Sequence, residues 1–406
     1  MGWQTPWAPA PEELSACIEC GLCLPHCPTY RLTGDESASP RGRLNAMAAV
    51  ASGELDVDEA FADVMGFCLQ CRACEPACPS MVPFGRAMEG ARAEVGWAHP
   101  TPTRAIRRSI LGTWLARPWA VRLATWGAGL VRRFGLTRGL PSAMRLGLAG
   151  LRPSRTSPSL RGTVHDPDGE AIADVGLLAG CVMDPWFPDV HASTVRVLTA
   201  AGYRVVVPGA QTCCGALAAH DGAAWEAERL AAINVEAFGR VDLVVTDAAG
   251  CGAHLKDYVH WSDDGEAFGA KVRDVTELVA AAIENGLLPR LPSRDEVVAV
   301  QDPCHLRHAQ RITDQPRDVV RAAGYEVVDV DDTGMCCGAA GVYSVMHPET
   351  SSELGRAKAV EVERTGATIV ASANPGCEMQ LRSHLDGRHR IVHPIELYAE
   401  ALAGSS

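Results

Sequence analysis

Two short segments near the start of the 406-residue chain carry four cysteines each, at identical intervals. They are Cys17, Cys20, Cys23 and Cys27 in the first segment and Cys68, Cys71, Cys74 and Cys78 in the second. Each segment reads C-x2-C-x2-C-x3-C-P, because proline follows both Cys27 and Cys78. In two-cluster iron–sulfur proteins, the first three cysteines of this run hold one cluster and the fourth holds the other. The spacing therefore predicts two [4Fe–4S] clusters.

The same rule assigns the ligands. Cluster one takes Cys17, Cys20, Cys23 and Cys78, and cluster two takes Cys68, Cys71, Cys74 and Cys27. Two-residue gaps let one tight loop wrap three corners of a cubane, and the proline then turns the chain toward the neighbouring cluster. Zinc also binds CxxC pairs, but it needs four thiolates in two separate pairs. A third cysteine at the same interval and a fourth before proline, both occurring twice, disfavour zinc.

Eight further cysteines, between positions 181 and 377, form an internal repeat. The first copy holds Cys181, Cys213, Cys214 and Cys251, and the second holds Cys304, Cys336, Cys337 and Cys377. In both copies a Cys-Cys-Gly triplet begins 32 positions after the first cysteine (181 to 213 and 304 to 336). Glycine there lets the backbone approach a metal centre closely. We expect a third redox centre, either an additional iron–sulfur cluster or a thiol–disulfide pair, with inert buried cysteine as the alternative.

Each copy is predicted to alternate strands and helices. Short apolar runs precede Cys181 and Cys304, as buried parallel strands do, and residues 223–238 carry apolar side chains at helical spacing. The cysteines fall after strands, at the carboxyl edge of a parallel sheet, where α/β proteins build their sites. All four cysteines of one copy should therefore meet at one edge.

A basic stretch separates the two cysteine groups. Between Val95 and His165 the chain has twelve arginines, no lysine and no acidic residue, although its net charge is −12. No nucleic-acid-binding motif accompanies these arginines, so we expect no nucleic-acid partner. The stretch is predicted to form several short helices. We interpret it as a packing arm with a solvated basic face or, because Trp114, Trp119 and Trp126 are interleaved with arginines, as a peripheral membrane contact.

Other functional classes find no support in the sequence. No glycine-rich fingerprint follows a predicted strand, so the chain is not expected to bind FAD or NAD itself. No Ser/His/Asp arrangement or pair of carboxylates suggests a catalytic residue, and no apolar run reaches the roughly 18 residues of a spanning helix. Without an export signal, and with thiols kept reduced, we expect a cytoplasmic protein or a peripheral complex at the inner face of the membrane.

Together these motifs resemble a known family. Two ferredoxin-type runs followed by a doubled Cys-Cys-Gly domain are similar to the glycolate oxidase iron–sulfur subunit, to the cysteine-rich subunit of heterodisulfide reductase and to the membrane-anchoring subunit of anaerobic glycerol-3-phosphate dehydrogenase. Residues 20–23, 27–30 and 34–43 most resemble the first of these. The resemblance implies an oxidoreductase's electron-transfer subunit, which takes electrons from an FAD-binding partner that oxidises a 2-hydroxy acid (glycolate or D-lactate). It further implies a respiratory acceptor such as a quinone.

One position departs from the heterodisulfide reductase pattern, in which each domain ends in CxxC. Here the third residue after Cys251 is His254, and the third after Cys377 is Gln380. His254 is a candidate substitute ligand or, alternatively, a polar surface residue. Two other activities stay open: thiol–disulfide catalysis, which the missing cysteines disfavour, and the role of the membrane-anchoring subunit in the glycerol-3-phosphate enzyme.

The predicted fold is α+β and multi-domain. Residues 1–97 are expected to form an α-helical, ferredoxin-like domain with two clusters, and residues 98–170 an Arg-rich helical linker. Residues 171–292 and 293–406 are expected to form two repeated α/β cysteine-rich domains that face each other. Substrate oxidation is expected on a partner chain.

Overall fold

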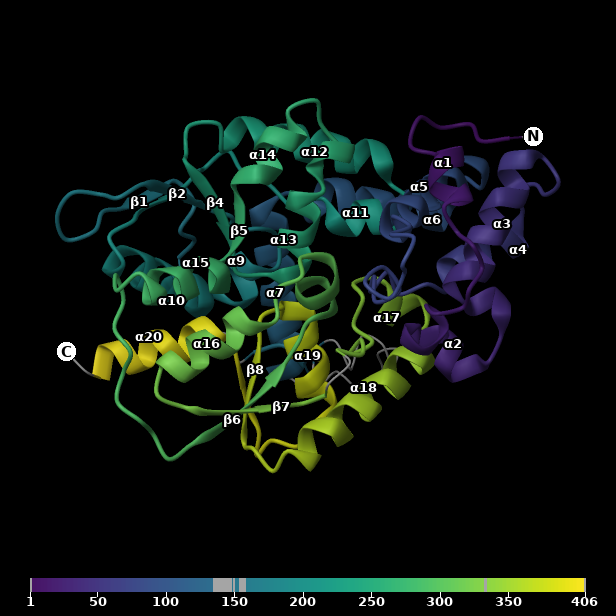
Figure 1. Ribbon diagram of the computed structural model, residues 1–406. Helices are drawn as coiled ribbons and strands as arrows, with labels where there is room; N and C mark the ends of the chain where they lie inside the picture. Colours follow the sequence, from purple (N-terminus) through teal and green to yellow (C-terminus); the bar gives the residue numbers. More distant parts are fainter. Residues whose placement is uncertain (1, 134–147, 149, 153–157, 332–333, 405–406) are drawn as a thin grey trace.

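The computed structural model contains a helical N-terminal region, a connection and two α/β units (Figure 1). The residues that it describes are 2–133, 148, 150–152, 158–331 and 334–404. The mixed α/β architecture expected from the sequence is present, with helices first and two parallel-rich sheets after them.

The N-terminal region consists of short helices that are stable because they pack together. They are α1 (Pro11–Ser15), α2 (Pro28–Thr33), α3 (Pro40–Ser52), α4 (Glu59–Gly66) and α5 (Phe84–Ala98). Met47, Met65 and Met88, from α3, α4 and α5, are fully buried in one shared core. The side chains of Ser39 and Asp58 cap α3 and α4 by accepting backbone hydrogen bonds. Both N-terminal cysteine runs lie in loops that this core supports.

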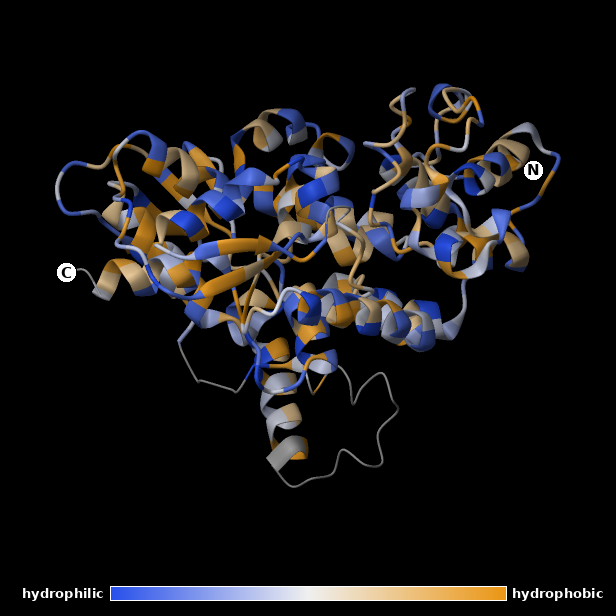
Figure 2. Ribbon diagram, turned by 60° about the horizontal axis from the view of Figure 1, so that its bottom comes forward, coloured by the Kyte–Doolittle hydropathy of each residue, from blue (hydrophilic) through white to orange (hydrophobic). Residues whose placement is uncertain are grey.

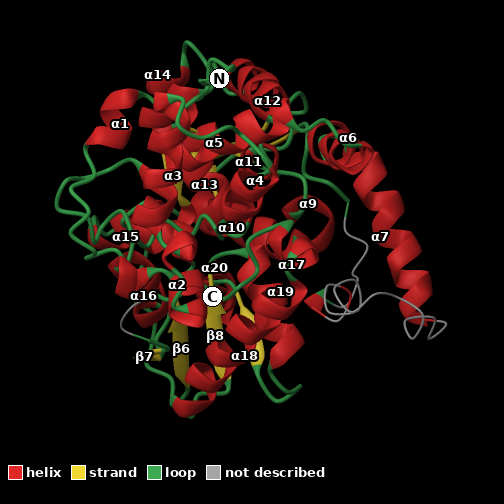
Figure 3. Ribbon diagram, turned by 90° about the vertical axis from the view of Figure 1, so that its right-hand side faces the viewer, coloured by secondary structure: helices red, strands yellow, loops and turns green. Residues whose placement is uncertain are grey.

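The arginine-rich connection begins with helices, as expected. α6 (Pro102–Ser109) continues through a π-helical turn (Ile110–Trp114), and α7 (Pro118–Arg133) follows. Figure 3 shows α6 and α7 along one flank of the molecule. The connection is not helical throughout, because β1 (Thr163–His165) pairs antiparallel with an edge strand of the first sheet. An open sheet edge has unpaired backbone groups, and β1 satisfies them.

Each cysteine-rich repeat is built around a parallel sheet. The strands are β2 (Asp174–Leu177), β3 (Arg204–Val207), β4 (Leu243–Thr246) and β5 (Val272–Asp274) in the first unit, and β6 (Val297–Gln301), β7 (Glu326–Asp329), β8 (Ile369–Ser372) and β9 (Arg390–Val392) in the second. Their orders are β1-β3-β2-β4-β5 and β7-β6-β8-β9, so the two sheets match strand for strand apart from β1. The strands are largely hydrophobic (Figure 2), as burial between helices requires.

Helices cover both sheets. The first unit contains α9 (Met183–Trp186), α10 (Pro188–Ala200), α11 (Ala216–His220), α12 (Ala224–Ala237), α13 (Ala249–Lys256), α14 (Gly265–Lys271) and α15 (Val275–Glu284). The second contains a π-helical turn (His305–Ala309), α16 (Asp314–Ala322), α17 (Tyr343–Met346), α18 (Pro348–Arg364), α19 (Pro375–His384) and α20 (Pro394–Gly404). The helix predicted within residues 223–238 is therefore confirmed as α12.

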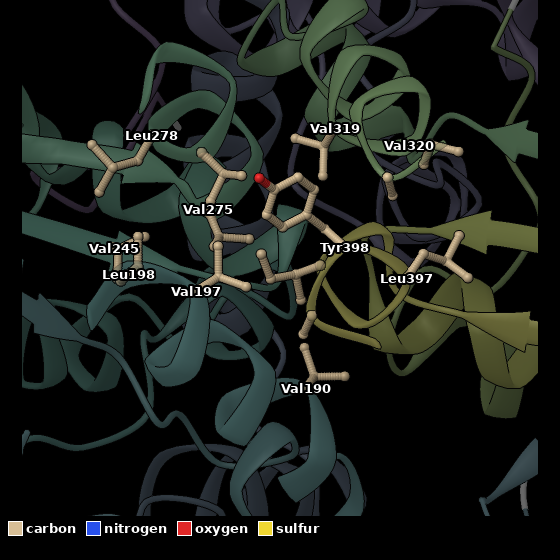
Figure 4. Packing of buried hydrophobic residues seen from close by; sticks show 14 of the residues in the cluster. Val190, Val197, Leu198, Val245, Val275, Leu278, Val319, Val320, Leu397 and Tyr398 are labelled. Carbon is tan, nitrogen blue, oxygen red and sulfur yellow. The ribbon is translucent and has the colours of Figure 1, made fainter. Parts of the chain in front are cut away.

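The two α/β units share one hydrophobic core rather than packing as separate bodies. Val197 of α10, Val275 of α15, Val319 of α16 and Tyr398 of α20 lie together in it (Figure 4). Tyr398 crosses this core, and its hydroxyl donates a hydrogen bond to the Pro289 carbonyl at 2.6 Å. Burying such apolar side chains stabilises the packing of the two α/β units against each other. Their cysteine-bearing edges are positioned relative to each other by this core.

Candidate iron–sulfur centres

The N-terminal cysteines line two small adjoining cavities. One cavity is bordered by Cys17, Cys20, Cys23, Cys74 and Cys78. The other is bordered by Cys27, Cys68, Cys71 and Cys74. The structure thus brings together the same four cysteines that the spacing assigns to each cluster, while their binding of iron stays a prediction. Because Cys74 borders both cavities, the two centres are immediate neighbours.

The loops around these cavities share an unusual backbone conformation. In the first run Glu19 and Gly21 have φ of 56° and 78°, and in the second Gln70 and Arg72 have φ of 52° and 60°. These are the second and fourth residues after the first cysteine of each run. Alternation between right- and left-handed conformations turns successive N–H groups inward and forms the concave nests found at iron–sulfur sites. Three non-glycine residues at positive φ carry strain, which a bound group would offset.

Burial and charge at the second cavity also suit a cluster. Burial raises the pKa of the Cys74 thiol well above its ordinary value, so it stays protonated unless a metal takes up the negative charge. Arg92 donates to the carbonyl oxygens of Met65 and Cys68, which places a cation beside this loop. Four thiols around a nest, next to a cation, are a donor set that fits a [4Fe–4S] cluster.

The four cysteines of the first repeat meet at the carboxyl edge of its sheet. The Sγ atoms of Cys181 and Cys213 are 3.3 Å apart, and those of Cys214 and Cys251 are 3.2 Å apart. They follow β2, β3 and β4, as predicted. Gly215 has φ of 94°, which a residue with a side chain rarely adopts, and this conformation turns the chain from the two vicinal thiols into α11. We call these four side chains the first quartet.

The second repeat forms an equivalent second quartet. The Sγ atoms of Cys337 and Cys377 are 3.1 Å apart, and Cys304 and Cys336 lie in one buried cluster. Gly338 has φ of 84°, which matches its counterpart in the first repeat. The prediction that all cysteines of a copy meet at one edge is thus confirmed for both copies. Within the described residues, no group of three or more His, Cys, Asp or Glu side chains has the geometry for a single metal ion.

The cysteine groups also contact one another across domain boundaries. Cys71, a cluster-two cysteine, packs with Cys304 and Cys336 of the second quartet in one buried cluster. The loops that lead to Cys251 and Cys377 are joined by a backbone hydrogen bond from the Ala249 N–H to the Ala373 carbonyl at 3.0 Å. The second quartet thus contacts the loop of cluster two through Cys71, and the first repeat borders the same loop through His254, which lines one cavity with Gln70.

Comparison with known proteins agrees with this arrangement. A 4Fe-4S dicluster domain model matches residues 13–82, and a cysteine-rich domain model matches residues 175–256 and 298–382. A probable glycolate oxidase iron-sulfur subunit from Bacillus subtilis is 34% identical and covers 96% of this chain and 94% of its own length. The chain belongs to the family of glycolate oxidase iron–sulfur subunits.

Other relatives share all or part of the chain. The glycolate oxidase iron-sulfur subunit of Escherichia coli is 31% identical, covering 97% of this chain and 95% of its own length. Lactate utilization protein A of Oceanobacillus iheyensis is 28% identical over 55% of this chain and 95% of its own length. Iron–sulfur clusters are the cofactors of this family member, and it is a subunit of an oxidoreductase. No helix in the described part of the chain is long and apolar enough to cross a membrane.

Sequence reasoning missed a polar junction between the cysteine groups of this iron–sulfur subunit. His220 and His305 stack with ring centroids 5.3 Å apart, and with Gln70 and His254 they border one small cavity. Burial, together with neighbouring cations, lowers the pKa of His220 well below its ordinary value. The only sequence signal was position, since His220 ends the helix after a Cys-Cys-Gly triplet and His305 directly follows Cys304.

His254 stands where the heterodisulfide reductase pattern has the last cysteine of its CxxC, and it is buried. His254 is 3% exposed, so the interpretation of it as polar surface is wrong. Burial lowers its pKa to about 4, which keeps the imidazole neutral with a lone pair on one ring nitrogen. Its ring meets Tyr258 edge-on at 5.5 Å.

The arginine-rich connection is a packing arm, but much of its basic face is paired rather than solvated. Arg107 bonds to Asp221 at 2.6 Å and Arg108 to Glu226 at 2.5 Å, both in the first repeat. Arg152 bonds to two buried carboxylates of the second repeat, Glu378 at 2.5 Å and Glu396 at 2.6 Å. The local excess of positive charge thus neutralises acidic groups on both α/β units.

Proposed function

We propose that this chain is the electron-transfer subunit of a flavin-dependent 2-hydroxy-acid dehydrogenase that acts on glycolate or D-lactate. A partner chain would carry FAD and oxidise the hydroxy acid to the 2-oxo acid, releasing two electrons and two protons. The observation that carries the proposal is the proximity of the four cysteine groups: the two cavities share Cys74, Cys71 packs against the second quartet, and a cavity beside the first quartet is bordered by residues of the second cysteine run. Iron–sulfur clusters pass electrons singly, and neighbouring centres are what such transfer requires.

The ligand sets follow from the cavities and the quartets. Cluster one would be held by Cys17, Cys20, Cys23 and Cys78, and cluster two by Cys27, Cys68, Cys71 and Cys74. An additional iron–sulfur centre would be held in each quartet, where four thiols converge from loops at the end of a sheet. The four thiols of the second quartet are all buried, which keeps water from that centre, whereas Cys20 of cluster one is exposed.

A quinone is the acceptor that we propose, and a cavity of about 360 Å³ beside Cys68 supports it. Phe67, Tyr343 and His347 form an aromatic wall there, with the Tyr343 and His347 rings 4.6 Å apart. Arg107 borders the same space. A planar ring with carbonyl oxygens matches an aromatic wall and a nearby hydrogen-bond donor. Reduction of the quinone to the quinol would consume the two electrons and two protons.

Peripheral membrane contact is the second part of this proposal. An exposed apolar ridge runs along α6, the π-helical turn and α7, and we call it the α6–α7 ridge. Its members are Ile106, Ile110, Trp114, Trp119, Leu123 and Trp126. Tryptophan and aliphatic side chains on one side of a helix suit the interface of a bilayer. Because Arg107 and Arg108 are paired with carboxylates, contact through this ridge would be mainly apolar.

The decisive experiment uses the complex isolated anaerobically through a tag on this chain. Addition of glycolate or D-lactate should produce the EPR signals of reduced clusters, whereas glycerol 3-phosphate should not. If the partner's flavin is reduced by a hydroxy acid while every cluster stays oxidised, the chain is not the electron carrier. Disulfide reduction is not favoured, because the relatives that span nearly the whole chain are glycolate oxidase subunits.

Membrane contact has its own test, flotation with vesicles of mixed zwitterionic and anionic lipids. Replacement of Trp119 and Trp126 by serine should lower the bound fraction several-fold. Trp97 is equally exposed but lies outside the ridge, so Trp97→Ser is the matched control. Equal binding of all three proteins would exclude the ridge as a membrane contact.

A further inference from the structure

The two repeats carry different side chains at one equivalent position beside their quartets. In the first repeat this is His254 on α13, three residues after Cys251, and in the second it is Gln380 on α19, three residues after Cys377. Side chains three residues apart lie on the same face of a helix. Each residue therefore stands on the face that carries its quartet's last cysteine.

The second repeat satisfies its residue with protein groups alone. The Gln380 amide donates to the Ser351 carbonyl oxygen at 2.9 Å and also lies 3.3 Å from the Ser351 hydroxyl. The Ser351 hydroxyl in turn donates to the Gly338 carbonyl at 2.8 Å, within the Cys-Cys-Gly loop. Gln380 thus braces this loop and has no need of a further partner.

The first repeat leaves the ring nitrogen of its residue unsatisfied. His254 is 3% exposed, and its Nε2 makes no hydrogen bond with any residue in the described part of the chain. Buried polar atoms are nearly always paired, so an orphaned ring nitrogen indicates a ligand that the protein alone does not supply. The same nitrogen lies against the Cys-Cys-Gly loop, because a β-carbon built on Gly215 would stand 3.2 Å from it. Glycine at this position leaves room between the imidazole and the first quartet.

We propose that His254 Nε2 is a ligand of the iron–sulfur centre in the first quartet, together with Cys181, Cys213, Cys214 and Cys251. This inference rests on the proposed function, which places a centre in each quartet. The second quartet would take no nitrogen ligand from the equivalent position, since the Gln380 amide is already engaged; its nearest histidine, His305, follows Cys304 directly and has Nδ1 3.6 Å from the Cys304 sulfur. Histidine would here replace the thiolate missing from the third position after Cys251.

The exchange of a thiolate for a neutral imidazole has a direct electronic consequence. It removes one negative charge from the centre, and histidine ligation raises the potential of iron–sulfur centres. The first quartet would then accept electrons more readily than the second. Because both repeats border the loop of cluster two, an electron arriving from cluster two would be drawn toward the first quartet in preference to the second.

The test is pulsed EPR on the full chain, reduced and anaerobically loaded, with histidine labelled by ¹⁵N. A strongly coupled histidine nitrogen should appear in the unmodified protein and disappear in His254→Gln, which copies the second repeat. Gln380→Asn is the matched control and should keep the nitrogen coupling. A second variant, His254→Cys, should keep the iron content, lose the coupling and lower the potential of that centre, so a folding failure of one variant does not decide the outcome.

Three results would overturn the inference. The first is a loaded first quartet without histidine coupling, and the second is a coupling that survives in His254→Gln. The third is an iron content of about eight per chain, which the ferredoxin-type pair alone accounts for. That last result would also remove the additional centres from the proposed function. Reduction of the remaining clusters by the hydroxy acid would still support the electron-transfer role, so the two failures are distinguishable.

Discussion

The two cysteine-rich repeats have the same strand order and the same cysteine spacing, but different surroundings. The second quartet packs against the loop of Cys71, so it faces the ferredoxin-type region. The first quartet lies beside the orphaned nitrogen of His254, which shares a cavity with Gln70 of that region. The comparison teaches that duplication supplied two equivalent thiol sites, and that packing gave them different neighbours.

The largest expected effect comes from replacing Cys71, the cluster-two cysteine that packs against the second quartet. Cys71→Ser should remove one of the two [4Fe–4S] EPR signals and nearly abolish transfer from the hydroxy acid to the acceptor, because the serine hydroxyl is a poor ligand for iron. Cys377→Ser is the control, and should leave both ferredoxin-type signals intact. Two undiminished signals in Cys71→Ser would refute the ligand assignment.

The next prediction separates the quartets. Cys304→Ser should block reduction of the second quartet, with which Cys71 of cluster two is in contact. Cys181→Ser should leave the second quartet reducible. Freeze-quenched EPR after addition of the hydroxy acid measures both. Equal loss of signals in the two variants would show that the quartets do not hold separate centres.

The packing arm offers a comparison in stability. Arg152→Ala removes the cation shared by the buried carboxylates Glu378 and Glu396 of the second repeat and leaves Glu378 paired with Arg382 alone; it should cost about 3 kcal/mol in the free energy of unfolding. Arg107→Ala breaks a less buried pair with Asp221 of the first repeat and should cost about 1 kcal/mol. Urea denaturation measures both values. A smaller loss for Arg152 than for Arg107 would contradict the role assigned to the arm.

The last expected effect is a pH dependence that arises from a buried pair in the first repeat. His191 and Asp247 are both buried, and the His191 Nδ1 lies 2.7 Å from the Asp247 carboxylate. Burial opposes the charge on each group, but the attraction between the two outweighs it. The pKa of His191 is therefore raised above 6.5, and the pKa of Asp247 is lowered below 3.8. Stability from the histidine is lost as pH rises through its raised pKa, and stability from the aspartate is lost as pH falls through its lowered pKa. The pair should therefore contribute most between about pH 4 and pH 6.5.

His191→Gln tests this expectation by denaturation at several pH values. The variant should be less stable by about 2 kcal/mol near pH 5.5, with a difference that shrinks above the raised pKa of His191. The second repeat has Arg317 paired with Asp302, and arginine does not titrate in this range, so Arg317→Leu is the control for a constant loss. A difference independent of pH in His191→Gln would contradict the prediction.

Much of the fold and of the candidate metal sites could be predicted from local sequence patterns. Cysteine intervals, the proline after each run and the apolar runs before Cys181 and Cys304 identified the cluster-binding loops, the repeat and its strands. These features are local because a tight loop or a buried strand depends on residues only a few positions apart. The convergence of each quartet also followed, since carboxyl ends of parallel strands share one edge.

Only the tertiary structure decided how these local sites are connected. Tertiary packing brings Cys71 against Cys304 and pairs Arg152 with Glu378, although each pair is more than two hundred positions apart in the sequence. It also buries His254. Such contacts depend on how whole helices and sheets pack, above all on the core shared by the two α/β units. The sequence by itself thus determined where the thiols would gather, and packing decided which of these groups contact one another and which polar side chains lie beside each of them.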